Sequence, residues 1–290
     1  MLKKSPIAFA IVSLLALLSG CIAPAPPKPG KKLVTICVQP IYSLHVMTQK
    51  YSPLFRYLAD ETGYDIRVVS AMSYDNYLPT LESNQVHLGI QNPLAYITLV
   101  KTRGAHALAK MVESNGNTLY RGTIIARKDS GIQKIEDLRG QTAAASSRRA
   151  IGGFFAQAYH CRQYGLDVNK DLRLVFVDTQ DAVVNAVYQR KVKVGFVRED
   201  ALPPAKDRID LNAITAIAYT EYYPTWCVAA FDETPPDVAR EITKALLNLD
   251  PENPEHRGVV ESIGIAGFQE ASDLDYDTLR KVMDGLSLPY

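Results

Sequence analysis

Residues 33–69, LVTICVQPIYSLHVMTQKYSPLFRYLADETGYDIRVV, contain the pattern from which the fold class follows. Residues 33–38 are mostly apolar and β-branched, which is typical of a buried strand. Residues 49–62 carry apolar side chains at helical spacing, and Gly63 is a common type of residue just beyond a helix end. Residues 65–69 then predict a second strand. This stretch therefore predicts a strand–helix–strand unit with parallel strands.

The same alternation of strands and helices continues along the chain. Further strands are predicted at 87–90, 105–112, 121–127, 142–145, 172–177, 192–197, 214–219 and 226–231. Further helices are predicted at 74–83, 92–101, 135–140, 151–164, 179–189, 236–248, 254–262 and 275–286. Such an order is typical of mostly parallel sheets with helices on both faces. The strands and helices form two such series, and the last segments return to the first series. This order predicts an α/β protein of two lobes, with a ligand cleft at the carboxyl ends of the strands.

The composition excludes several classes of protein. The chain has 290 residues, of which 22% are charged and 47% hydrophobic, so it can bury one large core or two smaller ones. These proportions exclude a disordered chain and a disulfide-dense mini-protein. Lysine and arginine number 32 against 31 acidic residues, so the overall charge gives no reason to expect binding to nucleic acid.

The N-terminus resembles the leader of bacterial lipoproteins. A short basic start is followed by an apolar stretch at 7–18 and by LSGC at 18–21, which is similar to a lipobox. The resemblance implies that 1–20 are a signal peptide and that Cys21 is acylated and anchors the protein to a membrane. Residues 21–32 contain four prolines and predict an extended tether. The alternative is an uncleaved anchor helix with a chance cysteine.

The remaining cysteines leave two interpretations open. Cys37, Cys161 and Cys227 could supply one disulfide in an extracytoplasmic protein, or they could be buried thiols in two strands and a helix. Their spacing, and that of the five histidines, does not suggest a metal site. The chain also lacks the common hydrolase, metalloprotease, phosphate-loop and dinucleotide motifs. We therefore expect neither a cofactor nor an enzyme.

Several local segments, in order, are similar to those of one family. They are PLFRYLADETG at 53–63, YDNY at 74–77, GIQNPLAY at 89–96, YRGTII at 120–125, and DSGI at 129–132 followed by DLRG at 137–140. Together they resemble the phosphonate-, phosphite- and phosphate-binding proteins of ABC transporters. The resemblance implies the fold of a type II periplasmic binding protein, with two α/β lobes and a hinged cleft.

The same resemblance gives the domain limits and the partners. It implies that 33–121 and 226–290 form the first lobe and that 122–225 form the second. It also implies a small anionic ligand, an ABC transporter permease as partner, and a location on the extracytoplasmic face of a membrane. We expect a monomer.

Tyrosines of the first lobe are the first candidate ligand contacts. Tyr96 ends a stretch that corresponds to a cleft-lining segment of the family, and its hydroxyl would be free to donate; the alternative is a ring packed on the sheet. Tyr74 lies at a strand-to-helix turn in a matching position and is favoured over Tyr77, because Tyr77 also continues an apolar helix face. Tyr42 follows the first strand, which is another cleft position.

Residues 145–153, ASSRRAIGG, correspond to the family's oxyanion-binding turn. In the family, hydroxyl residues at the start of a helix meet the anion together with free backbone N–H groups. This sequence departs from that pattern, because the three residues before Gly152 carry no hydroxyl. Ser147, Arg148 and Arg149 are the candidates here, since arginine can bind a carboxylate or phosphate through two hydrogen bonds. The alternative is two solvated arginines in a loop.

Four further candidates lie later in the chain. Gln180 stands where the family usually has histidine, and it can donate a hydrogen bond but carry no charge. Asp200 matches a cleft carboxylate of the family, with Glu199 as the second choice. Trp226 replaces an acid that would pair with a ligand ammonium group, so an aromatic wall that includes Tyr223 is expected instead. A buried structural tryptophan is the alternative.

Two function classes remain after the enzyme is set aside. The first is a lipid-tethered solute-binding protein of an ABC transporter, with phosphonate-like or phosphate-like oxyanions favoured. Carboxylates, sulfonates and nucleobase-like ligands stay open, because the site departs from the family pattern. The second is a receptor of the same fold that reports a bound ligand to a membrane sensor.

Overall fold

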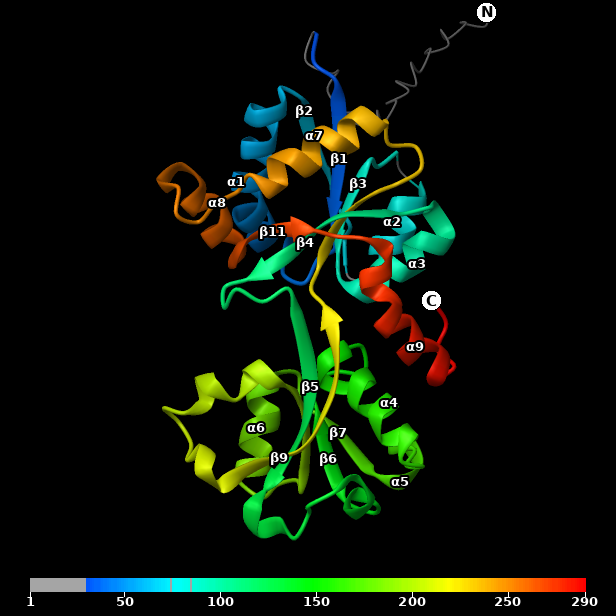
Figure 1. Ribbon diagram of the computed structural model, residues 1–290, viewed down its shortest axis with the longest axis vertical. Coiled ribbons are helices and arrows are strands. Elements are labelled where there is room, and N and C mark those ends of the chain that lie inside the picture. The colour runs from blue at the N-terminus through cyan, green and yellow to red at the C-terminus, as the bar shows by residue number, and fades with distance from the viewer. Residues whose placement is uncertain (1–29, 74, 84) are drawn as a thin grey trace, which may run out of the picture.

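The computed structural model describes residues 30–73, 75–83 and 85–290. The predicted signal peptide at 1–20, the lipidation site Cys21 and the candidate Tyr74 lie outside the described residues. Two separate β-sheets, each covered by helices, make up the described part (Figure 1). This arrangement confirms the predicted α/β class with two lobes. We call the six-stranded sheet with its helices lobe 1 and the five-stranded sheet with its helices lobe 2.

Lobe 1 is built on a sheet in the order β11-β4-β10-β3-β1-β2. Its strands are β1 (Leu33–Val38), β2 (Asp65–Val69), β3 (Leu88–Gln91), β4 (His106–Glu113), β10 (Cys227–Ala230) and β11 (Ile265–Glu270). Its helices are α1 (Leu44–Thr62), α2 (Tyr77–Ser83), α3 (Pro93–Arg103), α7 (Pro236–Leu247), α8 (Pro254–Ile263) and α9 (Asp277–Gly285). The strands β1, β2 and β3 pair in parallel, as predicted.

Lobe 2 is built on a sheet in the order β7-β6-β8-β5-β9. Its strands are β5 (Leu119–Arg127), β6 (Thr142–Ala145), β7 (Arg173–Phe176), β8 (Val194–Arg198) and β9 (Ile214–Pro224). Its helices are α4 (Ala156–Gln163), α5 (Val168–Asp171) and α6 (Gln180–Tyr188), and a π-helical turn, Ile151–Phe155, leads directly into α4. The pairs β6–β7 and β6–β8 are parallel, whereas β5 is antiparallel to both of its neighbours.

Three of the differences from the sequence prediction concern lobe 1. α1 begins at Leu44, five residues before the predicted start, because Met47 extends the buried face of the helix by one turn. β10 lies between β3 and β4 and runs antiparallel to both, since the chain returns from lobe 2 in the opposite direction. β11 was not predicted; it pairs with β4 at the edge of the sheet.

The helix ends follow the expected chemistry. The side chain of Asn92 accepts a hydrogen bond from the backbone N–H of Ala95 at 2.8 Å, which caps the start of α3. Gly63 has φ 71° and donates its N–H to the carbonyl of Ala59 at the end of α1. Among the described residues, no helix combines the length and the apolar composition that a membrane crossing requires.

The two lobes are joined by more than the chain itself. β4 leads into β5, and β9 leads into β10, so two crossing segments connect the sheets (Figure 1). α9 packs against α3 of lobe 1 and against α4 and β9 of lobe 2. One hydrophobic cluster contains residues of both lobes, such as Tyr276 and Tyr223. The exact limits of the lobes, 33–121 with 226–290 for the first and 122–225 for the second, stay a prediction. α9 contacts both lobes.

The three described cysteines are free and buried. Cys37 lies in β1, Cys227 in β10 and Cys161 in α4, so the interpretation as buried thiols is the one that the structure supports. Burial raises the pKa of the Cys37 and Cys161 thiols to about 12, and these thiols are therefore protonated at neutral pH.

Candidate functional site

The turn after β6 brings polar donors to the edge of lobe 2 that faces lobe 1. Ser146 is buried, and its Oγ accepts a hydrogen bond from Nε2 of Gln180 at 3.2 Å. The backbone of Gly153 runs so close that a Cβ there would lie 2.6 Å from the amide nitrogen of Gln180 and 2.7 Å from the Oγ of Ser146. The π-helical turn begins just before this glycine, and the first N–H groups of a helix have no acceptor within the helix.

The two arginines of this turn point in different directions. Arg149 donates to Asp75, which follows β2 in lobe 1, so this ion pair spans the lobes. Arg148 instead lies with its guanidinium 4.6 Å from the ring of Phe176 and donates to the side chain of Asn169 at 3.4 Å. Ser147 is exposed, and its Oγ accepts from the backbone N–H of Arg149. Arg149 is therefore the arginine of this turn that forms an ion pair with lobe 1.

Gln180 links the ends of two strands. Besides its contact with Ser146, its Oε1 accepts the backbone N–H of Arg198 at 3.0 Å. Its position at the start of α6 is fixed by Thr179, whose side chain accepts the backbone N–H of Ala182. The predicted residue is therefore next to the turn after β6, but both polar ends of its amide are already engaged within lobe 2.

Arg198, at the end of β8, forms a second charged contact between the lobes. It donates to Oε2 of Glu113, the last residue of β4, at 2.7 Å and to both oxygens of Asp200 at 2.9 and 2.5 Å. Its guanidinium carbon lies 4.2 Å from the ring centre of Tyr120. Burial lowers the pKa of Arg198, but the bonds with Asp200 and Glu113 outweigh this effect and hold its pKa above the usual value.

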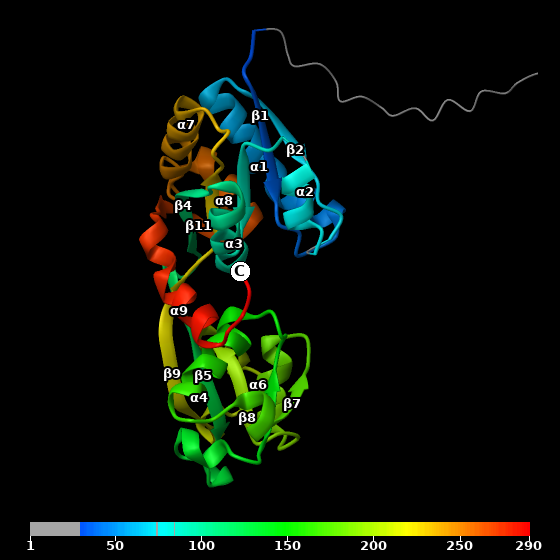
Figure 2. The same cartoon turned by 90° about the vertical axis from the view of Figure 1, so that its right-hand side faces the viewer.

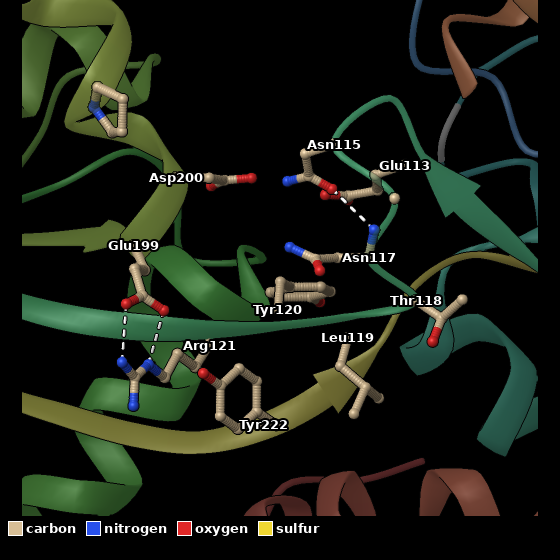
Figure 3. Close-up of a pocket in the computed structure, with 12 residues that line it drawn as sticks. Glu113, Asn115, Asn117, Thr118, Leu119, Tyr120, Arg121, Glu199, Asp200 and Tyr222 are labelled. Carbon is tan, nitrogen blue, oxygen red and sulfur yellow. Dashed lines mark hydrogen bonds and ion pairs between the residues drawn. The ribbon is translucent and has the colours of Figure 1, made fainter. Parts of the chain in front are cut away.

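A hollow of about 500 Å³ lies beside these residues at the junction of the lobes (Figure 3). Glu113, Asn115 and Asp200 point into it from opposite sides (Figure 3). Arg121 lies at its edge and binds Glu199 through two hydrogen bonds of 2.7 Å each. This contact lowers the pKa of Glu199. The wall is rich in carboxylates and amides, so an anion is disfavoured here unless it takes the place of one of these carboxylates.

Two of the predicted tyrosines are packed in the interior. Tyr96 is fully buried, and its hydroxyl donates to Oδ1 of Asp273 at 2.9 Å. The expectation that this hydroxyl is free to donate to a ligand is therefore wrong, because Asp273 follows β11 and lies against α3. Tyr223 is 1% exposed and packs among the residues shared by the lobes, so it does not form an exposed aromatic wall. Burial raises the pKa of both hydroxyls.

The remaining candidates, Trp226 and Tyr42, are partly or largely exposed. Trp226 is partly buried against the core of lobe 1 and lines a second hollow together with Glu113, Arg198 and Asp200. Tyr42 is 52% exposed and lines an apolar pocket of lobe 1. The structure thus brings Trp226 and Asp200 together, and separately Gln180 and the 146–153 turn.

Sequence reasoning missed Arg198, Glu113, Tyr120 and Asp75. Arg198 directly precedes Glu199 and Asp200, which the sequence predicts as candidates. Its position next to them could have indicated that it belongs to the site. Glu113 is 85 residues away from Arg198 in sequence, and nothing local to either residue indicates the contact. The same holds for Asp75 and Arg149, which are 74 residues apart.

Comparison with known proteins gives a consistent result. The family model described as "ABC transporter, phosphonate, periplasmic substrate-binding protein" matches residues 36–276. The phosphonates-binding periplasmic protein of Escherichia coli is 20% identical over 274 residues, which are 91% of this chain and 80% of that protein. The tetrathionate sensor histidine kinase TtrS of Salmonella typhimurium is 27% identical over 191 residues. These are 61% of this chain but only 31% of the kinase.

A solved structure shows the same fold. PhnD1 from Prochlorococcus marinus, in complex with methylphosphonate, has a TM-score of 0.68 to this chain at 14% identity and covers 88% of this chain and 98% of its own. At this level of identity the likeness concerns the fold, which is that of a type II periplasmic binding protein.

Proposed function

Because this chain belongs to the family of periplasmic substrate-binding proteins of phosphonate ABC transporters, we propose that it captures a small oxyanion between its lobes and delivers it to a permease. Phosphonate-like or phosphate-like solutes are the favoured ligands. The function needs no chemical step, since capture and release suffice. The family acts on the extracytoplasmic side of a membrane, and the proposed lipid on Cys21 would hold this protein there.

One observation carries the choice of an anion. Arg149 and Arg198 of lobe 2 each bind a carboxylate of lobe 1, Asp75 and Glu113 respectively. Each of these two arginines is therefore already bound to the carboxylate of a lobe 1 residue. A phosphonate also offers two oxygens that can accept paired hydrogen bonds from one guanidinium. A ligand that replaces one of these carboxylates would be held where the two lobes meet.

Capture would be coupled to a hinge movement. The crossing segments 114–118 and 225–226 connect the sheets and are the places where the relative orientation of the lobes can change. A ligand that contacts both lobes favours the conformation in which both contacts are made. The contacts of α9 with both lobes limit this movement on one side of the molecule.

Isothermal titration calorimetry on the purified protein tests the proposal. Methylphosphonate, phosphate, methanesulfonate and acetate form the panel, and Arg149→Ala is compared with Arg148→Ala. A charge-assisted hydrogen bond contributes about 1.5–3 kcal/mol, so Arg149→Ala should weaken the bound anion about tenfold or more. Arg148→Ala is the matched control, because Arg148 packs on Phe176 within lobe 2. Lack of binding by the whole panel, or equal effects of both variants, would contradict the anion site.

The lipid anchor has its own test. Cells that express the protein are labelled with a radioactive fatty acid, and wild type is compared with Cys21→Ser. Label on wild type alone supports the anchor. If neither protein is labelled, the proposed lipid anchor is wrong.

A sensor role is the second candidate, and the similarity to a sensor histidine kinase over 191 residues favours it. In that case the ligand-bound protein would regulate a membrane sensor instead of supplying a permease. Deletion of the gene distinguishes the two roles: loss of uptake of the labelled ligand indicates transport, whereas unchanged uptake with a lost transcriptional response indicates sensing.

A further inference from the structure

Lobe 1 contains an apolar pocket of about 260 Å³ that none of the roles above uses. It lies between the first turns of α1 and the ends of β1 and β2. Its lining is dominated by aromatic, methionine and valine side chains, namely Tyr42, Met47, Tyr51, Phe55, Val69 and Met72. Aromatic and methionine side chains give adaptable contacts for apolar groups.

Two polar side chains in the α1 wall of the pocket, Thr48 and Ser52, are already engaged. The hydroxyl of Thr48 donates to the carbonyl of Leu44 at 2.9 Å, and the hydroxyl of Ser52 donates to the carbonyl of Thr48 at 2.6 Å. Both hydroxyl protons are therefore used within the helix, and this wall offers a ligand mainly carbon atoms. An apolar group is the kind of occupant that such a wall favours.

The mouth of the pocket is surrounded by exposed apolar side chains. Tyr42 is 52% exposed, Leu44 63% and Met72 89%. All three line the pocket as well, so the exposed surface and the cavity are continuous. Apolar surface that gathers around a cavity is a common mark of a binding site.

The mouth lies close to the place where the lobes touch. The lining segments 38–44 and 68–72 are the carboxyl ends of β1 and β2 with the residues that follow them, and the chain then reaches Asp75. Asp75 binds Arg149 of lobe 2, so the segment that closes the pocket is next to an interlobe contact. Figure 2 shows α2, which follows this segment, on the same side of the molecule as β7 and opposite to β9.

We propose that this pocket binds the apolar group of an organic anion whose charged group replaces Asp75 at Arg149. The inference rests on the proposed function and narrows its ligand to anions that carry a single ring or a branched alkyl group. A cavity of about 150 Å³ accommodates benzene, so one substituted ring fits here. Methylphosphonate and inorganic phosphate would leave the pocket unfilled and bind more weakly.

Matched pairs of ligands test the inference by calorimetry on the purified protein. The pairs are methylphosphonate with phenylphosphonate, methanesulfonate with benzenesulfonate, and acetate with benzoate. For the head group that binds, the phenyl member should bind at least tenfold more tightly. Equal affinities within a pair overturn the pocket assignment but leave the anion site intact. Absence of binding by every member overturns the proposed function, and this inference with it.

Variants of the pocket wall locate the effect. Thr48→Phe places a ring in the wall and should remove the phenyl preference without changing the affinity for the methyl ligand. Gln49→Phe is the matched control, because Gln49 is the next residue of α1, is exposed and does not line the pocket. Leu44→Ser is a second variant, with a reduced preference expected. Circular dichroism checks that both variants are folded. If Thr48→Phe and Leu44→Ser are folded and still prefer the phenyl ligand as strongly as wild type does, the ring binds elsewhere and the inference is wrong.

Discussion

Arg198, the last residue of β8, donates to Oε2 of Glu113, the last residue of β4, at 2.7 Å and thereby joins the two sheets by a charged contact. The two side chains are about one quarter exposed, so the contact is neither fully solvated nor fully buried. Asp200 binds the same guanidinium from within lobe 2. One arginine therefore has one carboxylate partner that moves with it and one that belongs to the opposite lobe.

An anion that binds at Arg198 competes with Glu113, so Glu113→Gln should raise the affinity for such an anion. The amide preserves the shape of the side chain but removes the charge that competes with the ligand for Arg198. A partly exposed ion pair contributes about 0.2–1 kcal/mol, which corresponds to a factor of up to about five in affinity. Calorimetry with the tightest-binding anion measures the change. Glu199→Gln is the control, since Glu199 lines the same hollow but binds Arg121. A lower affinity in Glu113→Gln would contradict competition at Arg198.

The Arg121–Glu199 contact should make stability depend on acid pH. The hydrogen bond from Arg121 lowers the pKa of Glu199 below its ordinary value of 4.5. The Glu199 carboxyl therefore loses its proton at a lower pH in the folded protein than in the unfolded chain. The resulting stabilisation is complete above pH 4.5 and is lost as the pH falls through the lowered pKa.

Urea unfolding of wild type and Glu199→Gln checks this dependence. Wild type should be the more stable protein at pH 7, and the difference between the two proteins should shrink as the pH is lowered from 4.5 through the lowered pKa of Glu199. A difference that stays constant over this range would show that the ion pair does not contribute to folding.

The sequence predicted the order of elements well because each element carries its own periodic pattern. Asn92 before Pro93, for example, predicted the start of α3, and the side chain of Asn92 does cap it. β11 was missed because residues 265–270, IAGFQE, contain a glycine and no strict alternation. Its strand conformation depends on pairing with β4, which lies more than 150 residues earlier. Patterns of this kind become visible only when the partner strand is known.

The candidate site was predicted less completely for the same reason. The turn at 146–153 and Asp200 were found from local resemblance, and the structure places them at the face of lobe 2 that meets lobe 1. The carboxylates that bind Arg149 and Arg198 come from lobe 1, and no local pattern indicates them. Tyr96 was predicted as a ligand contact from its local position on α3. Its hydroxyl is instead bound to Asp273, which lies far away in the sequence and could not be placed beside it from local patterns.

Tyr96→Phe should lower stability and leave ligand affinity unchanged. The substitution removes the hydroxyl that donates to Asp273 and accepts the N–H of Ala107 at 3.3 Å. Loss of a buried hydrogen bond that leaves a polar group without its partner costs about 1–3 kcal/mol. Thermal unfolding and calorimetry on the same preparation measure both quantities. A weaker ligand affinity with unchanged stability would restore Tyr96 as a ligand contact.

Gly285→Ala should destabilise the protein through the contact between α9 and α4. A Cβ at Gly285 would lie 2.2 Å from Cε2 of Tyr159, so the ring of Tyr159 must move. Because α9 packs on both lobes, this strain falls where they share a hydrophobic cluster. Overpacking of this kind costs about 1–3 kcal/mol.

Gly258→Ala is the matched control for this substitution. Gly258 lies within α8, and a Cβ there would have no atom within 4 Å, so alanine should stabilise the helix by about 0.5–1 kcal/mol. Urea unfolding curves of both variants against wild type give the comparison. Opposite signs are expected because the two glycines differ in their surroundings and not in helix propensity. If Gly285→Ala is as stable as Gly258→Ala, α9 does not pack tightly against Tyr159 in solution, and its restraint on the hinge is absent.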